Sequence, residues 1–172
     1  MRLSIGIFAL CATVAVAYAV PAAADDCEAI VSASLKQASV PYRGDMTITQ
    51  TGQQPTKAQT VYMVNKLYTQ VNGQWTVTPM NQQQLAQQIN DSMKKGNISC
   101  KKIGQDSVGG EAATVYTAHN VQQGATVDTK SWISNGRNLP LKSESHIRVG
   151  SGGQTIQMTL NYTNVSAPAG VK

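Results

Sequence analysis

Glu144 and His146 are the side chains whose types and spacing come closest to a catalytic or metal-binding pattern. They are separated by one residue, so on a β-strand both lie on one face, where they could bind a metal ion or act as an acid–base pair. Lys142 and Arg148 continue the same alternation, which is typical of a solvated strand face. We favour the solvated face, and we predict no metal site and no catalytic residue.

Other catalytic motifs are missing from the sequence. No Gly-x-Ser-x-Gly pattern occurs, and Ser143 and Ser145 alternate with Glu144 and would lie on the opposite face. The glycine-rich stretch 150–153 is followed by neither a Lys-Ser/Thr pair nor a helix, so it fits a hairpin tip better than a phosphate-binding loop. We therefore expect a protein that is not an enzyme and that needs no cofactor.

The charge balance is basic but spread thinly. The formal net charge is +5, and about +4 remains once Arg2 is removed with the leader described below. The basic clusters are Lys94-Lys95 and Lys101-Lys102, with no aromatic residues between them, so nucleic acid is not predicted as a partner. A basic rim could make transient contact with an anionic membrane surface, and an ordinary solvated surface explains the charges equally well.

The N-terminus has the pattern of a secretory leader. Met1-Arg2-Leu3 is followed by an apolar run over 5–20, and Ala22-Ala23-Ala24 precedes Asp25-Asp26 as a cleavage site. A second candidate cleavage site lies at 17–19, and a retained membrane anchor is the alternative interpretation. We predict that 1–24 is a signal peptide of the Gram-negative type, that 25–172 forms one domain, and that the protein is periplasmic.

Two cysteines lie after the leader, Cys27 and Cys100. In an oxidising compartment an isolated pair of this kind is expected to form a disulfide, and the spacing does not fit a Cys-x-x-Cys redox motif. The bond would close a loop of about 74 residues, which the chain-entropy model credits with roughly 4 kcal/mol of stabilisation. We expect it to hold the first helix against the sheet.

The remaining pattern predicts mainly antiparallel strands with two helices. Asp25-Asp26 offers a helix N-cap, Pro41 ends that helix, and Asn72-Gly73 is a strong hairpin signal because both residue types tolerate positive φ. Further glycine-containing turns separate the later strands. The predicted order is a helix over 25–38, strands over 45–53, 59–71 and 74–78, a helix over 80–95, and strands over 98–106, 112–121, 126–134, 139–149 and 155–165.

Side-chain alternation predicts which faces are apolar. Ile156, Met158, Leu160 and Tyr162 share one face of the last strand, so that face is expected to be dry. In the predicted strand over 59–71, Val61, Met63 and Leu67 are expected on one face, with Tyr62, Val64 and Tyr68 on the other. The helix over 80–95 has a narrow apolar stripe of Leu85, Ile89 and Met93, so it should lie across another element rather than inside a core.

The last third of the chain resembles a known family. The motifs are Trp132-Ile133-Ser134, Leu139-Pro140-Leu141-Lys142 after a turn, and the segment Tyr-Thr-Asn-Val-Ser-Ala-Pro at 162–168. Their order is similar to that of the periplasmic lipoprotein carriers with the LolA-like fold. This resemblance implies an N-terminal helix under a strongly curved sheet, an inserted helix that acts as a lid, and a lipid or an acylated protein as ligand.

Together these observations predict an α+β protein. Its expected architecture is a strongly curved antiparallel sheet, a half-open β-barrel of about eight strands. We expect a monomer that binds an apolar ligand on the concave face; the alternative is a periplasmic sensor or protein-interaction module without lipid cargo. The residues predicted to line the ligand site are Met63, Leu67, Trp75, Val77, Leu85, Ile89, Met93, Ile156, Met158, Leu160 and Tyr162.

Overall fold

The computed structural model describes residues 23–95, 97–122 and 124–171, so the predicted leader lies almost entirely outside the described residues. Its elements follow a simple order along the chain. They are α1 (Ala23–Gln37), β1 (Tyr42–Gln50), β2 (Thr56–Met63), β3 (Lys66–Val71), β4 (Gln74–Pro79), α2 (Gln82–Lys95), β5 (Asn97–Val108), β6 (Glu111–Gln122), β7 (Ala125–Ser134), β8 (Pro140–Val149) and β9 (Gly152–Asn161).

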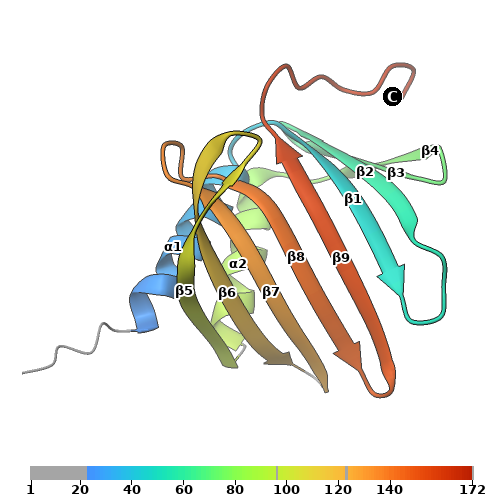
Figure 1. The fold of residues 1–172 in the computed structure, drawn as a ribbon. Helices are drawn as coiled ribbons and strands as arrows, with labels where there is room; N and C mark the ends of the chain where they lie inside the picture. The colour runs from blue at the N-terminus through green and yellow to red at the C-terminus, as the bar shows by residue number, and fades with distance from the viewer. Residues whose placement is uncertain (1–22, 96, 123, 172) are drawn as a thin grey trace, which may run out of the picture.

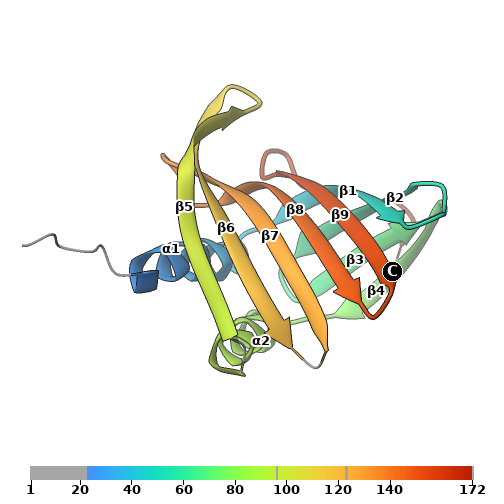
Figure 2. The ribbon, with the colours of Figure 1, turned by 60° about the horizontal axis from the view of Figure 1, so that its bottom comes forward.

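The nine strands of this described part form one antiparallel sheet in the order β4-β3-β2-β1-β9-β8-β7-β6-β5. The pairing of β1 with β9 joins the N-terminal hairpins to the C-terminal ones. The sheet bends strongly, and both helices lie on its concave side (Figures 1 and 2). The structure thus confirms the predicted α+β class and the curved, open sheet with two accompanying helices.

The predicted strand over 59–71 is two strands, which raises the strand number above the expected eight. Val64 and Asn65 form a tight turn between β2 and β3, and Asn65 adopts a φ of 70°. Across this turn Val61 pairs with Tyr68, so these two side chains share a face. Leu67 pairs with Tyr62 and lies on the opposite face from Val61, so the predicted face assignment was wrong.

The predicted hairpin at Asn72-Gly73 is confirmed. Both residues have positive φ, 51° for Asn72 and 81° for Gly73, and they connect β3 to β4. Two consecutive residues with positive φ give a turn whose twist matches that of the flanking strands, which is why this residue pair fixes the register locally.

Helix α1 is attached to the edge strand of the sheet in two ways. The predicted disulfide between Cys27 and Cys100 is present and joins α1 to β5. One residue earlier, the Oδ2 atom of Asp26 accepts a hydrogen bond of 2.8 Å from the backbone nitrogen of Lys102. Because α1 begins at Ala23, Asp26 lies inside the helix rather than capping it as predicted; its carboxylate instead satisfies an amide of the edge strand.

Helix α2 begins with a capping box that the sequence analysis did not recognise. The backbone nitrogen of Gln84 donates to Asn81 Oδ1 at 2.8 Å, and the nitrogen of Asn81 donates to Gln84 Oε1 at 3.4 Å. The helix packs chiefly against α1. Neither of these two described helices combines the length and the apolar character needed to cross a membrane.

The register divides the sheet into two faces, which we call inner and outer. Cys100 bonds to α1, so its side chain marks the inner, concave face. Residues paired directly across the sheet share a face. The inner row that starts at Cys100 continues through Ala118, Thr129, Ser145, Ile156 and Ile48.

Gly44 leaves a gap in the inner face that neighbouring side chains fill. A Cβ atom on Gly44 would lie 2.8 Å from Thr60 Oγ1 and 3.3 Å from the sulfur of Met158. We expect Gly44→Ala to lower the free energy of unfolding by about 1–3 kcal/mol, because these groups have to move. Gly136→Ala is the matched control, since nothing lies within 4 Å of its Cβ position. Equal urea midpoints for the two variants would contradict this prediction.

Candidate functional site on the concave face

Half-buried apolar side chains gather at the centre of the inner face. Ile156 and Met158 of β9 pair with Ile48 and Met46 of β1, and all four are neither fully exposed nor fully buried. Leu160, one row further along β9, is buried. Helix α1 packs mainly against β5, several strands away, so the central strands present an apolar surface that the described part of α1 leaves incompletely covered.

Three tyrosines close one end of this surface. The rings of Tyr42 and Tyr62 stack with centroids 5.4 Å apart, and the ring of Tyr162 lies 6.3 Å from that of Tyr42. Tyr62 is only 2 % exposed. Burial raises the pKa of both the Tyr42 and the Tyr162 hydroxyl, so these groups stay neutral at physiological pH. The cluster is therefore an uncharged end wall for the inner face.

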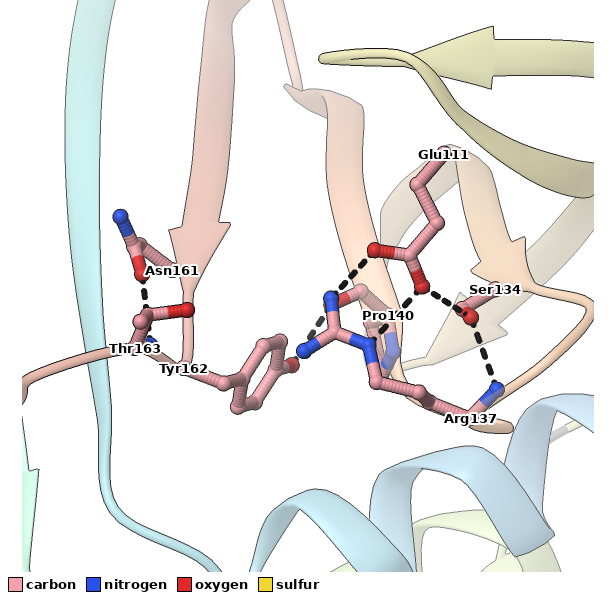
Figure 3. A network of polar contacts seen from close by, with 7 residues as sticks. All are labelled: Glu111, Ser134, Arg137, Pro140, Asn161, Tyr162 and Thr163. Atoms are coloured by element: carbon pink, nitrogen blue, oxygen red, sulfur yellow. Dashed lines mark hydrogen bonds and ion pairs between the residues drawn. The ribbon is translucent and has the colours of Figure 1, made fainter.

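A polar network holds Tyr162 in this position (Figure 3). Its hydroxyl donates a 2.6 Å hydrogen bond to the carbonyl oxygen of Pro140, and the guanidinium of Arg137 lies 5.3 Å from the ring centroid. Arg137 also binds Glu111 through two hydrogen bonds of 2.8 and 2.5 Å, and Ser134 donates to the same carboxylate. The β7–β8 turn is thereby tied to β6 and to the segment after β9.

This network predicts how stability depends on pH. The Arg137 guanidinium and the Ser134 hydroxyl hold the pKa of Glu111 below its usual value. A carboxylate with a lowered folded-state pKa contributes stability above its unfolded pKa, about 4.3, and the contribution is lost as pH falls through the folded value. We expect Glu111→Gln to flatten the loss of stability below about pH 4, measured by urea unfolding. Identical acid profiles for the two proteins would contradict this.

The structure brings together only part of the predicted ligand set. Ile156, Met158 and Leu160 share the inner face of β9 as predicted, and Tyr162 lies just beyond the strand against Tyr42. Leu67 pairs with Tyr62 and so also belongs to the inner face. Their role in ligand binding stays a prediction.

The α2 members of the set lie on the concave side with their helix. Leu85 and Ile89 are half-buried, and the side chain of Met93 lies outside the described residues. Helix α2 packs chiefly against α1, so a lid position of this helix over the sheet stays a prediction.

Three predicted lining residues lie on the wrong face. Val77 pairs with Tyr68, and Tyr68 pairs with Val61, which places Val77 on the outer face with Met63. Trp75 lies two residues before Val77 on β4, so it shares the outer face with Val77. The prediction that Met63, Trp75 and Val77 join Ile156 in one lining was therefore wrong, because the strand register places all three on the outer face.

Residues of β1, β7 and β8 were missing from the predicted set. Met46 and Ile48 alternate with polar residues in β1, so the period-two pattern could have identified them. Val127 and Ile147 pair with each other on the inner face, one row beyond Ile156, and both are half-buried. Only the strand order shows that these side chains extend the apolar surface toward β7.

The Glu144–His146 pair lies on the outer face in a polar row, as favoured in the sequence analysis. Glu144 accepts a 2.6 Å hydrogen bond from Gln157, and His146 lies 3.0 Å from the hydroxyl of Thr155. Nearby, Asp128 binds His119 at 2.7 Å and Arg148 at 2.5 Å. No group of three potential metal ligands is found in the described part of the chain.

The outer face also carries two shallow hollows. One, of about 560 Å³, lies among Lys101, His119, Lys130 and Glu144; the other, of about 540 Å³, lies among Asp45, Lys57, Gln59 and Lys142. Charged side chains line both hollows, which makes them poor sites for a hydrocarbon chain. The half-buried apolar surface of the inner face is the better candidate for an apolar ligand.

Comparison with known proteins gives a match at the level of structure. No family model and no curated protein matches the sequence. The crystal structure of MucB aligns with a TM-score of 0.53 at 14 % identity, over 87 % of this chain and 62 % of the MucB chain. LprF from Mycobacterium bovis aligns with a TM-score of 0.46 at 11 % identity, over 85 % of this chain and 96 % of the LprF chain. A LolA-superfamily protein from Nitrosomonas europaea aligns with a TM-score of 0.31 at 8 % identity, over 81 % of this chain and 91 % of its own chain.

The fold and the comparisons define the class of protein. The chain has a LolA-like fold, the fold that the motifs at 132–134, 139–142 and 162–168 resembled. It spans less than two thirds of the MucB chain, and the likeness shows the fold alone. The Cys27–Cys100 bond is the kind of structural disulfide found outside the cytoplasm, and we describe the protein as extracytoplasmic.

Proposed function

We propose that this protein is a periplasmic, non-enzymatic binding protein that holds the acyl chain of a lipid or of an acylated protein on the concave face of its sheet. The observation that carries the proposal is the set of half-buried apolar side chains at the centre of that face, chiefly Ile156, Met158, Met46 and Ile48. They lie between the tyrosine cluster and the hairpin ends of the strands, on the side where both helices lie (Figure 2).

The energetics of burial fit a reversible carrier. Transferring about ten methylene groups from water to this surface releases about 8 kcal/mol before the losses of association are subtracted. The predicted signal peptide over 1–24 would deliver the protein to the periplasm, where the disulfide forms.

A direct experiment tests the proposal. The protein is purified from the periplasm of its own host and analysed by native mass spectrometry, and the delipidated protein is titrated with the apolar fluorophore diphenylhexatriene. We expect bound lipid in the first measurement and saturable fluorescence in the second. Protein that is free of ligand from the periplasm and that also fails to bind the fluorophore would overturn the proposal.

A second candidate is a protein-interaction module without lipid cargo. MucB, which shares the fold, has been crystallised in complex with MucA(peri). By this hypothesis another protein binds to this chain, and the apolar surface of the inner face carries no lipid. Crosslinking in the periplasm followed by recovery of one protein partner and no lipid would favour it over the carrier.

A further inference from the structure

Asn120 carries a buried acceptor that no described group satisfies. It lies on β6, where it pairs with Ile98 on one side and Val127 on the other. The row continues to Ile147 of β8, so Asn120 is a polar side chain between apolar ones on the inner face. Its Oδ1 atom is shielded from solvent and receives no hydrogen bond from the described residues.

An orphan acceptor of this kind is unusual in a folded protein. Nearly all buried polar groups have a partner, because desolvation without a hydrogen bond is unfavourable. Thr114, on the same face of the same strand, shows the usual arrangement: it accepts from Gln105 at 3.0 Å and donates to Asn135 at 2.7 Å. A carboxamide left unsatisfied beside an apolar site is therefore placed to receive a donor from outside the chain.

Asn120 lies on the same face of the sheet as the proposed site. Helix α2 ends at Lys95, and Ile98, the partner of Asn120, is the second residue of β5. On the inner face, the row of paired residues that contains Asn120 lies next to the row that contains Ile156, and three strand steps separate β6 from β9. The apolar neighbours supply contact with hydrocarbon, and Asn120 supplies a single directional contact.

We propose that Asn120 Oδ1 accepts a hydrogen bond from a hydroxyl or amide N–H group next to the ligand's acyl chain, and that it selects donor-bearing amphiphiles over purely hydrogen-bond-accepting ones. The inference rests on the proposed function, since it assigns the polar end of that same ligand. It makes Asn120 a specificity-determining residue.

The test compares two amphiphiles that share a dodecyl chain and an ether or hydroxyl oxygen, and only one of them has a hydrogen-bond donor. Dodecan-1-ol has a hydroxyl donor and dodecyl methyl ether has the same chain with an acceptor alone; each displaces diphenylhexatriene, which has no polar group. We expect the wild-type protein to bind the alcohol about fivefold more tightly than the ether, the effect of one neutral hydrogen bond. Asn120→Leu should remove this preference, and Asn120→Gln, which keeps a neutral carboxamide acceptor, should retain it.

Stability gives an independent readout without ligand. Asn120→Leu removes an unsatisfied acceptor at similar volume, so we expect its Tm to rise by about 2–4 °C. Thr114→Val, the matched control, removes a satisfied hydroxyl and should lower the Tm. A fall in the Tm of Asn120→Leu would mean that the acceptor is satisfied in the free protein, and would overturn the inference.

The binding outcomes separate the two proposals. Equal affinity of the wild-type protein for alcohol and ether, or a preference that persists in Asn120→Leu, overturns the role of Asn120 and leaves the carrier function standing. Failure of the wild-type protein to bind diphenylhexatriene or either amphiphile overturns the carrier function and the inference with it.

Discussion

Met158→Asp should weaken the binding of an acyl chain at least about tenfold, because a carboxylate beside hydrocarbon loses hydration without gaining a partner. Met158 lies at the centre of the inner face, where it pairs with Met46 of β1 and Ser143 of β8. Neither neighbour carries a charge that could compensate. Titration with diphenylhexatriene, or with a fluorescent fatty acid, measures the effect.

The neighbouring residue provides the matched control. Thr159 is exposed on the outer face, between Asp45 and Lys142 in the register. Thr159→Asp adds the same charge in water beside a lysine, so binding should change little. Circular dichroism establishes whether both variants are folded. If Met158→Asp does not fold, the neutral variant Met158→Gln replaces it in the binding experiment. Equal loss of binding in the two aspartate variants would contradict an inner-face site.

Removal of the disulfide should have the largest effect on stability. Cys27 and Cys100 are separated by 73 residues, and opening a loop of this size costs about 4 kcal/mol in the chain-entropy model. For a domain of this size, that corresponds to a fall in Tm of about 8–16 °C in the Cys27→Ser/Cys100→Ser variant. Differential scanning calorimetry measures it.

Reduction of the wild-type protein provides the control for this variant. Wild-type protein in dithiothreitol should show the same lower Tm as the double variant, and dithiothreitol should not affect the variant itself. The release of α1 also removes its attachment to β5, although the hydrogen bond from Lys102 to Asp26 remains. A double variant as stable as the wild type would show that the disulfide does not restrain the unfolded chain.

The curved sheet itself was predictable because its signals are local. Asn72-Gly73 fixed one hairpin through two positive φ angles, and the alternation along β9 fixed which side chains share its inner face. The pairing of Cys27 with Cys100 followed from the number of cysteines after the leader. Each of these conclusions depends on a few consecutive residues or on a count.

Errors arose where a short turn was not recognised. Val64-Asn65 carries no glycine, so 59–71 was interpreted as one strand although Asn65 has positive φ. Because side chains alternate with a period of two, each residue beyond a missed turn can be assigned to the wrong face. That single omission placed Leu67 on the same face as Met63, whereas Leu67 lies on the inner face and Met63 on the outer face.

The amino-acid sequence by itself determined that the chain forms a disulfide-linked, mainly antiparallel protein with a dry face on its last strand, since these features come from residue type and short-range periodicity. Only the tertiary structure decided which strands surround that face. Closure of β1 onto β9 set Met46 beside Met158, and the β5–β6–β7 register put Asn120 between apolar neighbours. Such contacts join residues far apart in the chain, and their register depends on every strand pairing between them.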